Sequence, residues 1–136
     1  MGAGVLIFND QDKLLIVKPS YKDYWSLPGG VVEDGESPRA GCLREVKEEI
    51  GLNLSGLAFV CLDYTCDTEK GESLQFVFTA KMVDDPIKID NQEIEDYRFV
   101  SEAGALKLVG GNLQRRLPKC FEAVKQNKAI YLENGE

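Results

Sequence analysis

Short apolar runs separated by polar turns mark the first part of the chain. The runs "AGVLIF" (3–8) and "KLLIVK" (13–18) have the length and composition of β-strands, and the polar "NDQD" between them predicts a hairpin. The following "YWSLPGGVVEDGE" (24–36) contains too much glycine and proline for a helix. We therefore expect a short strand followed by loops in this stretch.

A helix is predicted at residues 38–50. Ser37 can cap its first turn, Pro38 suits the first helical position, and Gly51 supplies a C-terminal stop. Apolar side chains three and four positions apart share one face of a helix. The predicted core-facing stripe is Ala40, Leu43, Val46 and Ile50.

The rest of the chain alternates between strand-like and helix-like patterns. Strands are expected at 57–66, 74–83 and 96–101, with an edge strand at 129–132. A closing helix is expected at 111–127, where Pro118 either interrupts the helix or moves its start to a later residue. Mostly strands with one early and one late helix predict an α+β fold, a mixed sheet between helices.

Composition places the chain among ordinary globular proteins. Its 136 residues, 43% hydrophobic and 29% charged, fit one domain spanning 1–136. No run reaches membrane-spanning length, and the first residues lack the basic start and apolar core of a signal peptide, so a cytoplasmic protein is expected. Without a CxxC pair, the cysteines are expected to be reduced, small apolar fillers. They are Cys42, Cys61, Cys66 and Cys120.

Charge and the absence of histidine narrow the chemistry. A formal net charge of -7 argues against binding to nucleic acid polymers or anionic membranes, which need clustered Lys and Arg. With no histidine, Ser-His-Asp and Cys-His catalysis and imidazole zinc sites are excluded. Acid-base chemistry must come from carboxylates, lysines, tyrosines or metal-bound water, and an anionic substrate would need a bridging cation.

The predicted helix also carries a crowd of carboxylates. Glu45, Glu48 and Glu49 are expected opposite the core stripe, and like charges at such spacings destabilise a helix by a few tenths of a kcal/mol per pair. Arg44 could offset this by pairing with Glu48 or Glu36. A divalent cation, which prefers oxygen ligands, could do so instead. A merely solvated helix face is the third option.

The pattern around these glutamates resembles the Nudix box, the signature of the Nudix hydrolases. Its matching positions are Gly30, Glu36, Arg44, Glu45, Val46, Glu48, Glu49, Gly51 and Leu52. The preceding "YWSLPGG" looks like the family's lead-in, and "EIEDYRFVS" (93–101) resembles its acidic segment before the last strand. The resemblance implies the Nudix fold and metal-dependent hydrolysis of a nucleoside diphosphate linked to another group X.

The resemblance also implies roles for individual residues. Glu45, Glu48 and Glu49 would be ligands of Mg²⁺ or Mn²⁺, joined by the backbone carbonyl of Gly29. Arg44 would act in the catalytic centre as the partner of Glu36. The remaining roles are structural: Glu36 would hold the leading loop, and Gly30 and Gly51 would meet backbone requirements.

The general base is expected to be a carboxylate. In the family it is sometimes a box glutamate, here Glu45 or Glu48, and sometimes a residue of a later loop. By its spacing ahead of Phe99, Glu93 is the candidate for that later carboxylate, and Glu95 is the reserve. A plain polar loop before a strand would have the same sequence pattern.

Residues that contact the substrate are less clearly indicated by the sequence than the box residues. Lys18 and Arg39 are candidates for phosphate binding, although ordinary surface charge explains both. Aromatic residues at 24–25 could stack on a base or simply pack, and the arginines at 115–116 are expected to face solvent.

The family's markers for ADP-ribose and dinucleoside polyphosphate hydrolases are missing near residues 68–70, which favours a nucleoside triphosphate or an oxidised nucleotide as the substrate. Alternatives are a hydrolase of nucleotide sugars or ADP-ribose, and a Nudix-fold sensor that binds nucleotide without cleaving it. The oligomeric state stays open, with a homodimer as one option.

Overall fold

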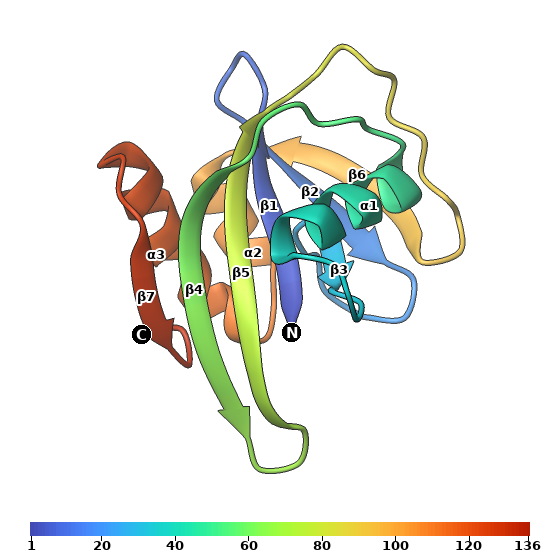
Figure 1. Cartoon of the computed structure of the whole chain (residues 1–136). Helices are drawn as coiled ribbons and strands as arrows, with labels where there is room; N and C mark the ends of the chain where they lie inside the picture. The colour runs from blue at the N-terminus through green and yellow to red at the C-terminus, as the bar shows by residue number, and fades with distance from the viewer.

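The computed structural model describes residues 1–136 as one mixed sheet with helices on both faces (Figure 1). The elements are β1 (Gly2–Phe8), β2 (Leu14–Pro19), β3 (Gly29–Val31), α1 (Pro38–Ile50), β4 (Ala58–Asp67), β5 (Gly71–Lys81), β6 (Ile94–Val100), α2 (Glu102–Leu108), α3 (Asn112–Lys125) and β7 (Ile130–Glu133). The predicted α+β fold, with a mixed sheet between helices, is confirmed.

Strand β1 has two different partners along the same edge, β3 at its start and β2 at its end, so the sheet branches there. Its strand order is β6-β2-β1-β5-β4-β7, with β3 paired to β1 off this path. The start of β1 pairs with β3, from Gly2 opposite Val31 to Gly4 opposite Gly29, whereas its last residue, Phe8, pairs with β2. The chain around β3 therefore fills the space between two diverging strands. Parallel pairs β1·β5 and β4·β7 make the sheet mixed.

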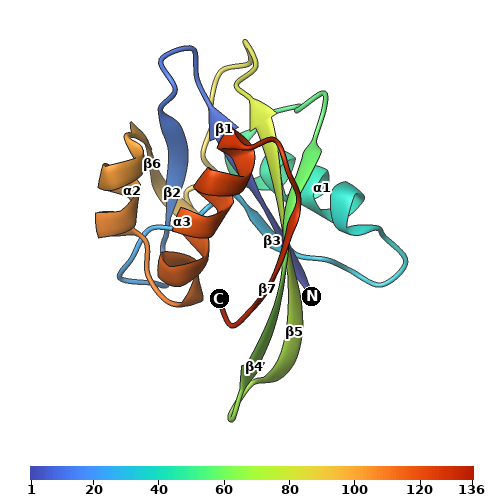
Figure 2. The same cartoon turned by 90° about the vertical axis from the view of Figure 1, so that its left-hand side faces the viewer.

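Two apolar cores, one on each face, hold the layers together. Figure 2 shows α1 on one side of the sheet and α2 and α3 on the other. Successive side chains of β1 point to opposite faces of the sheet and so contribute to both cores. Val5 and Ile7 join the core under α1, and Leu6 joins the core under α3. Burying both faces of the central strand explains why it has an unbroken apolar sequence.

Helix α1 has the predicted bounds and caps. The Ser37 hydroxyl accepts from the Ala40 N–H at 3.0 Å, and Gly51 ends the helix at φ 75°. Its buried face is rotated from the predicted one, because Ala40 is exposed and Leu43 is only half-buried. The buried positions are Gly41, Cys42, Val46, Glu49 and Ile50. The flank of α1 that packs against β3 became interior, and periodicity alone could not show this.

Two other expectations, both about helices, need correction. Helix α2 was not predicted, although Ser101 caps it and Glu102 opens it. Helix α3 runs unbroken through Pro118, which is exposed, while Leu117 and Phe121 bury the opposite side against the sheet. That packing outweighs the lost helical hydrogen bond.

The cysteine expectation holds at three positions, since Cys42, Cys61 and Cys120 are buried, whereas Cys66 is exposed near the tip of the β4–β5 hairpin. None of the three helices has the length and apolar character needed to cross a membrane.

Candidate metal centre

Three carboxylates converge beside the point where the sheet branches. Glu45 and Glu49 come from α1, and Glu93 comes from the loop that leads into β6. One oxygen of each lies within 4.8 Å of the others. Glu49 is buried, Glu45 is half-buried and Glu93 is exposed, so the group opens to solvent on one side. Glu93, predicted from the family resemblance and its spacing ahead of Phe99, thus lies close to two of the box glutamates.

This group, the carboxylate cluster, has little positive charge near it, since Glu45 alone is paired with an arginine, Arg44. Glu49 is only 7% exposed, and burial raises its pKa to about 8, with Glu45 and Glu93 adding repulsion. One N–H, that of Gly29, donates to Glu49 Oε1 at 2.9 Å and opposes this shift. Burial also raises the pKa of Glu45. Burial and mutual repulsion make it unfavourable to hold these carboxylates together in their charged form. Their oxygens are the hard donors that a divalent cation prefers.

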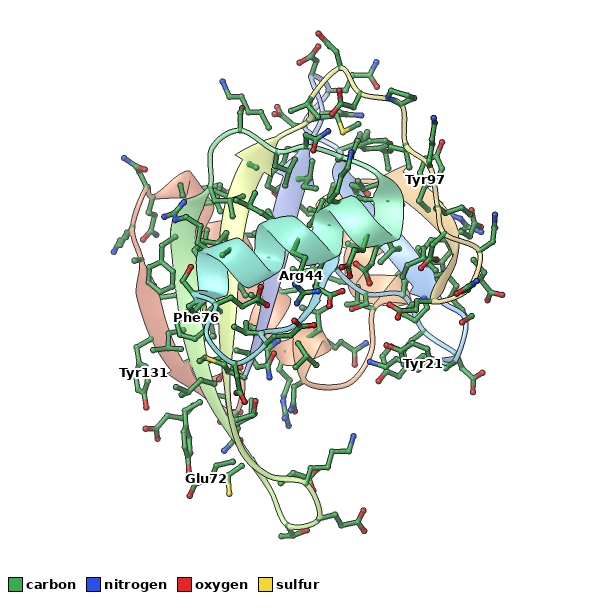
Figure 3. All side chains as sticks on the ribbon, turned by 45° about the vertical axis from the view of Figure 1, so that its right-hand side comes forward. Tyr21, Arg44, Glu72, Phe76, Tyr97 and Tyr131 are labelled. Atoms are coloured by element: carbon green, nitrogen blue, oxygen red, sulfur yellow. The ribbon has the colours of Figure 1, made fainter.

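Arg44 holds the neighbouring carboxylates. It donates to both oxygens of Glu36, at 2.7 and 3.1 Å, and to one oxygen each of Glu45 and Glu48 at 3.1 Å. Its fifth bond, to the Val31 carbonyl, ties α1 to β3. Figure 3 shows Arg44 on the side of α1 where acidic oxygens gather. The hydrogen bond from Arg44 lowers the pKa of Glu36 to about 2.

Glu48 stands apart from the carboxylate cluster. The sequence analysis placed it with Glu45 and Glu49 on one side of the helix, yet Glu48 is 60% exposed at its side chain and bonded to Arg44. Rotation of the buried face turns Glu49 inward and leaves Glu48 outward. Its role as a metal ligand stays a prediction.

Two glycines of β3 let the helix and the sheet approach each other. A Cβ on Gly30 would lie 2.5 Å from Cδ of Glu45. A Cβ on Gly29, whose φ is 141°, would lie 2.1 Å from the Ala3 carbonyl oxygen. Any larger residue would therefore displace Glu45 or β1. The role of the Gly29 carbonyl as a ligand stays a prediction.

The loop that carries Glu93 is braced by a residue that the sequence analysis missed. Asp90 Oδ1 accepts from the N–H groups of Gln92, Glu93 and Ile94 at 2.9 to 3.2 Å. The Ser20 N–H donates to the Glu93 carbonyl at 2.8 Å. An Asp followed by Asn is a common turn signal, which could have pointed to this loop.

The two phosphate-binding candidates have protein partners instead. Lys18 donates to Glu95 at 3.0 Å, to the Pro19 carbonyl at 2.9 Å and to the Lys22 carbonyl. Arg39 donates to the Leu57 carbonyl and lies over a phenylalanine ring of the sheet. Neither lines the cleft described next, so the structure gives no support to these two assignments. Glu95, bound to Lys18, lies outside the carboxylate cluster.

A cleft of about 450 Å³ runs from the carboxylate cluster to the α3 side of the sheet. Gly29 and Glu49 line one end, and Gln75 and Arg116 line the other. Tyr24 lines it as well, whereas Trp25 is buried in the core under α3, as expected of a packing residue. Clefts of this size enclose small organic ligands such as nucleosides.

Comparisons with known proteins identify the family. A family model described as the NUDIX domain matches residues 1–119. The solved structure of a MutT protein from Methanosarcina mazei Go1 superposes with a TM-score of 0.74 at 24% identity, over 93% of this chain and 94% of that one. A UDP-X diphosphatase structure gives a TM-score of 0.79 at 25% identity, over 97% and 66%. The chain belongs to the Nudix family.

Curated relatives share a shorter segment. An RNA pyrophosphohydrolase from Hydrogenovibrio crunogenus (strain DSM 25203 / XCL-2) is 42% identical over 52 residues, which are 38% of this chain and 32% of that protein. The chain spans about a third of the length of the first curated relatives that it matches, at 35%, 32% and 32%.

Proposed function

We propose that the chain is a Nudix hydrolase that cleaves the diphosphate linkage of a nucleoside diphosphate joined to a group X, with a nucleoside triphosphate or an oxidised nucleotide as the substrate. One observation carries the proposal: Glu45, Glu49 and Glu93 converge beside a nucleoside-sized cleft with little positive charge to balance them. The names of relatives, an RNA pyrophosphohydrolase and a UDP-X diphosphatase, agree with this chemistry.

Mg²⁺ or Mn²⁺ fits the donors present. All of them are carboxylates or carbonyls, the ligands that these cations prefer. We assign Glu45 and Glu49 as the main ligands, with Glu48 and the Gly29 carbonyl as further ones, and Glu93 as the carboxylate that faces the bound cation from the open side. When bound, the cation supplies charge neutralisation of the diphosphate and acidifies a water.

The chain's own residues orient the reaction. Glu93 is exposed at the rim of the carboxylate cluster, so it can accept the proton of an attacking water. Glu45 is the alternative base. Arg44 acts by position, because it is bonded to Glu36 and Glu45 and fixes the carboxylate that it contacts. Displacement at phosphorus then yields a nucleoside monophosphate and either phosphorylated X or pyrophosphate.

A substrate panel tests the proposal. Product release would be measured with nucleoside triphosphates, oxidised nucleotides, nucleotide sugars, ADP-ribose and dinucleoside polyphosphates, each with Mg²⁺, Mn²⁺ or EDTA. We expect turnover of a triphosphate class with either metal and none with EDTA. Nucleotide binding without turnover of any class would contradict the proposal and favour a sensor. Cytoplasmic location and homodimer formation stay predictions from the sequence.

A further inference from the structure

Strand β6 forms an unpaired edge of the sheet. It lies outside β2 (Figure 2), whereas the strand at the other edge, β7, has only four residues. Four successive side chains of β6, from Glu95 to Arg98, are exposed. An exposed edge strand is a template for pairing with another strand, so most proteins protect it with charges, bulges or a covering element. The groups along β6 therefore decide what this edge can bind.

The backbone of Tyr97 points outward, away from β2. Its partner on β2 is Val17. The Val17 N–H donates to the Ser26 carbonyl at 2.9 Å, and the Ser26 N–H donates to the Val17 carbonyl at 2.8 Å, so Val17 has no main-chain group left for Tyr97. In an antiparallel ladder such a pair is not hydrogen-bonded, and the N–H and carbonyl of Tyr97 face the open edge. The N–H is held by its neighbour, Asp96 Oδ1, at 2.8 Å.

The side chains before and after Tyr97 carry opposite charges that no other residue balances. Asp96 precedes it and Arg98 follows it, and neither takes part in any ion pair of the chain. Because side chains alternate along a strand, Asp96 and Arg98 share one face and Tyr97 lies on the other. The Arg98 guanidinium is held over the Trp25 ring, 4.6 Å from its centroid.

Antiparallel pairing of two β6 strands about a twofold axis at Tyr97 satisfies both charges. Tyr97 then faces Tyr97 of the second copy, and Asp96 faces Arg98 of the second copy at both ends of the central pair. Opposite charges and aromatic pairs directly across two strands both stabilise the pairing. An axis at Asp96 or at Arg98 would instead place like charges opposite each other, so the charge pattern specifies the register.

We propose that the chain forms a homodimer in which β6 pairs antiparallel with β6 of a second copy, so that the two sheets become one. In this isologous interface the Tyr97 N–H leaves Asp96 for the Tyr97 carbonyl of the second copy, which frees the Asp96 carboxylate for Arg98. None of residues 95–99 lines the cleft, so both copies keep an open site. The inference goes beyond the proposed function and does not depend on it.

Analytical ultracentrifugation of the unaltered protein gives the first test. The measurement uses about 0.15 M salt, which screens the repulsion between two copies of net charge -7. Between about 1 and 300 µM protein, we expect the average mass to rise from 15.1 kDa toward twice that value. A mass that stays at one chain over the whole range would overturn the proposal.

A charge exchange tests the register. Arg98→Asp places two carboxylates against each other at both ends of the central pair and should raise the dimer Kd at least about tenfold. Adding Asp96→Arg restores opposite charges and should bring the Kd back to within about threefold of the parent. Both variants lack the contact with Trp25, so that loss cannot explain a recovery. Lys119→Asp makes the same change in net charge at an exposed residue of α3 and should keep the parent Kd.

A weakened dimer that the second substitution does not restore would overturn the proposed pairing, as would a dimer that Arg98→Asp leaves unchanged. Tyr97→Pro tests the backbone of the interface. It removes an N–H that faces the open edge and makes no bond to β2, so the chain should keep its circular dichroism spectrum and stay monomeric. A dimer of unchanged Kd in this variant would show that another surface is used. If Tyr97→Pro does not fold, the charge exchange decides.

Discussion

Two neighbouring groups of carboxylates at α1 differ in how their negative charge is balanced. Glu36 and Glu48 are paired with Arg44, and the pKa of Glu36 falls to about 2. Glu49, the residue after Glu48, is buried beside Glu45 and Glu93, and burial raises its pKa to about 8. Arg44 pairs with both members of the first group but with only Glu45 of the second, so Glu49 and Glu93 have no cationic side chain of the protein bonded to them. The difference distinguishes carboxylates whose charge the protein itself balances from those that we propose as the main metal ligands.

The largest expected effect comes from replacing one glutamate of each group by glutamine. Glu49→Gln removes a carboxylate from the carboxylate cluster and should lower kcat by roughly two to four orders of magnitude. Glu48→Gln alters an exposed partner of Arg44 and should cost about tenfold. Steady-state kinetics at saturating Mg²⁺, with thermal melts of both variants, measure this difference.

In EDTA at pH 5.5, both variants should melt near the parent temperature, since neither change touches the apolar core. A loss at Glu48 as large as that at Glu49 would show that Glu48 leaves Arg44 to bind metal. Glu36 would then be the one carboxylate paired with Arg44 that has a purely structural role.

A smaller effect is expected from Gly30→Ala. The new methyl would lie 2.5 Å from Cδ of Glu45, so that carboxylate must move away from Glu49 and Glu93. We expect kcat/KM to fall by roughly tenfold to a hundredfold with little change in the folded structure, as measured by kinetics and circular dichroism. Gly56→Ala, where the methyl meets nothing within 4 Å, is the control. Full activity in Gly30→Ala would mean that the position of Glu45 is not critical.

Sequence reasoning succeeded where the determining contacts are local. The bounds of α1 follow from Ser37, Pro38 and Gly51, which act within one or two turns. The pairing of Glu36 with Arg44 spans a single loop and helix turn, and the structure contains it. The family resemblance and the spacing ahead of Phe99 also indicated Glu93, although five intervening residues that form a strand are a weaker constraint than a helix.

The failures share a different cause, which is tertiary packing. Burial of Glu49 depends on the approach of β3, which two glycines permit. Burial of Arg116 depends on Asp63, a residue 53 positions away that reaches it only after β4 and α3 meet. The carboxylate cluster itself joins α1 to a loop more than forty residues later, so neither its membership nor the exclusion of Glu48 could be predicted from one helical pattern.

The comparison also predicts how the metal-free protein responds to pH. Since the folded-state pKa of Glu49 is raised from 4.5 to about 8, its contribution to stability is fully present below pH 4.5 and is lost as the pH rises through 8. Glu36, with its lowered pKa, contributes oppositely but changes only below pH 4.5. In EDTA, Tm should therefore fall by about 5 °C or more between pH 5.5 and 8.5.

Glu49→Gln removes the titrating group, so that variant should lose most of this slope. Excess Mg²⁺ should raise Tm most at high pH, because the ionised carboxylate binds the cation and the neutral acid does not. A parent slope equal to that of Glu49→Gln would mean that Glu49 is already ionised at neutral pH. Its charge would then be balanced within the protein, as that of Glu36 is, and the contrast between the two groups would disappear.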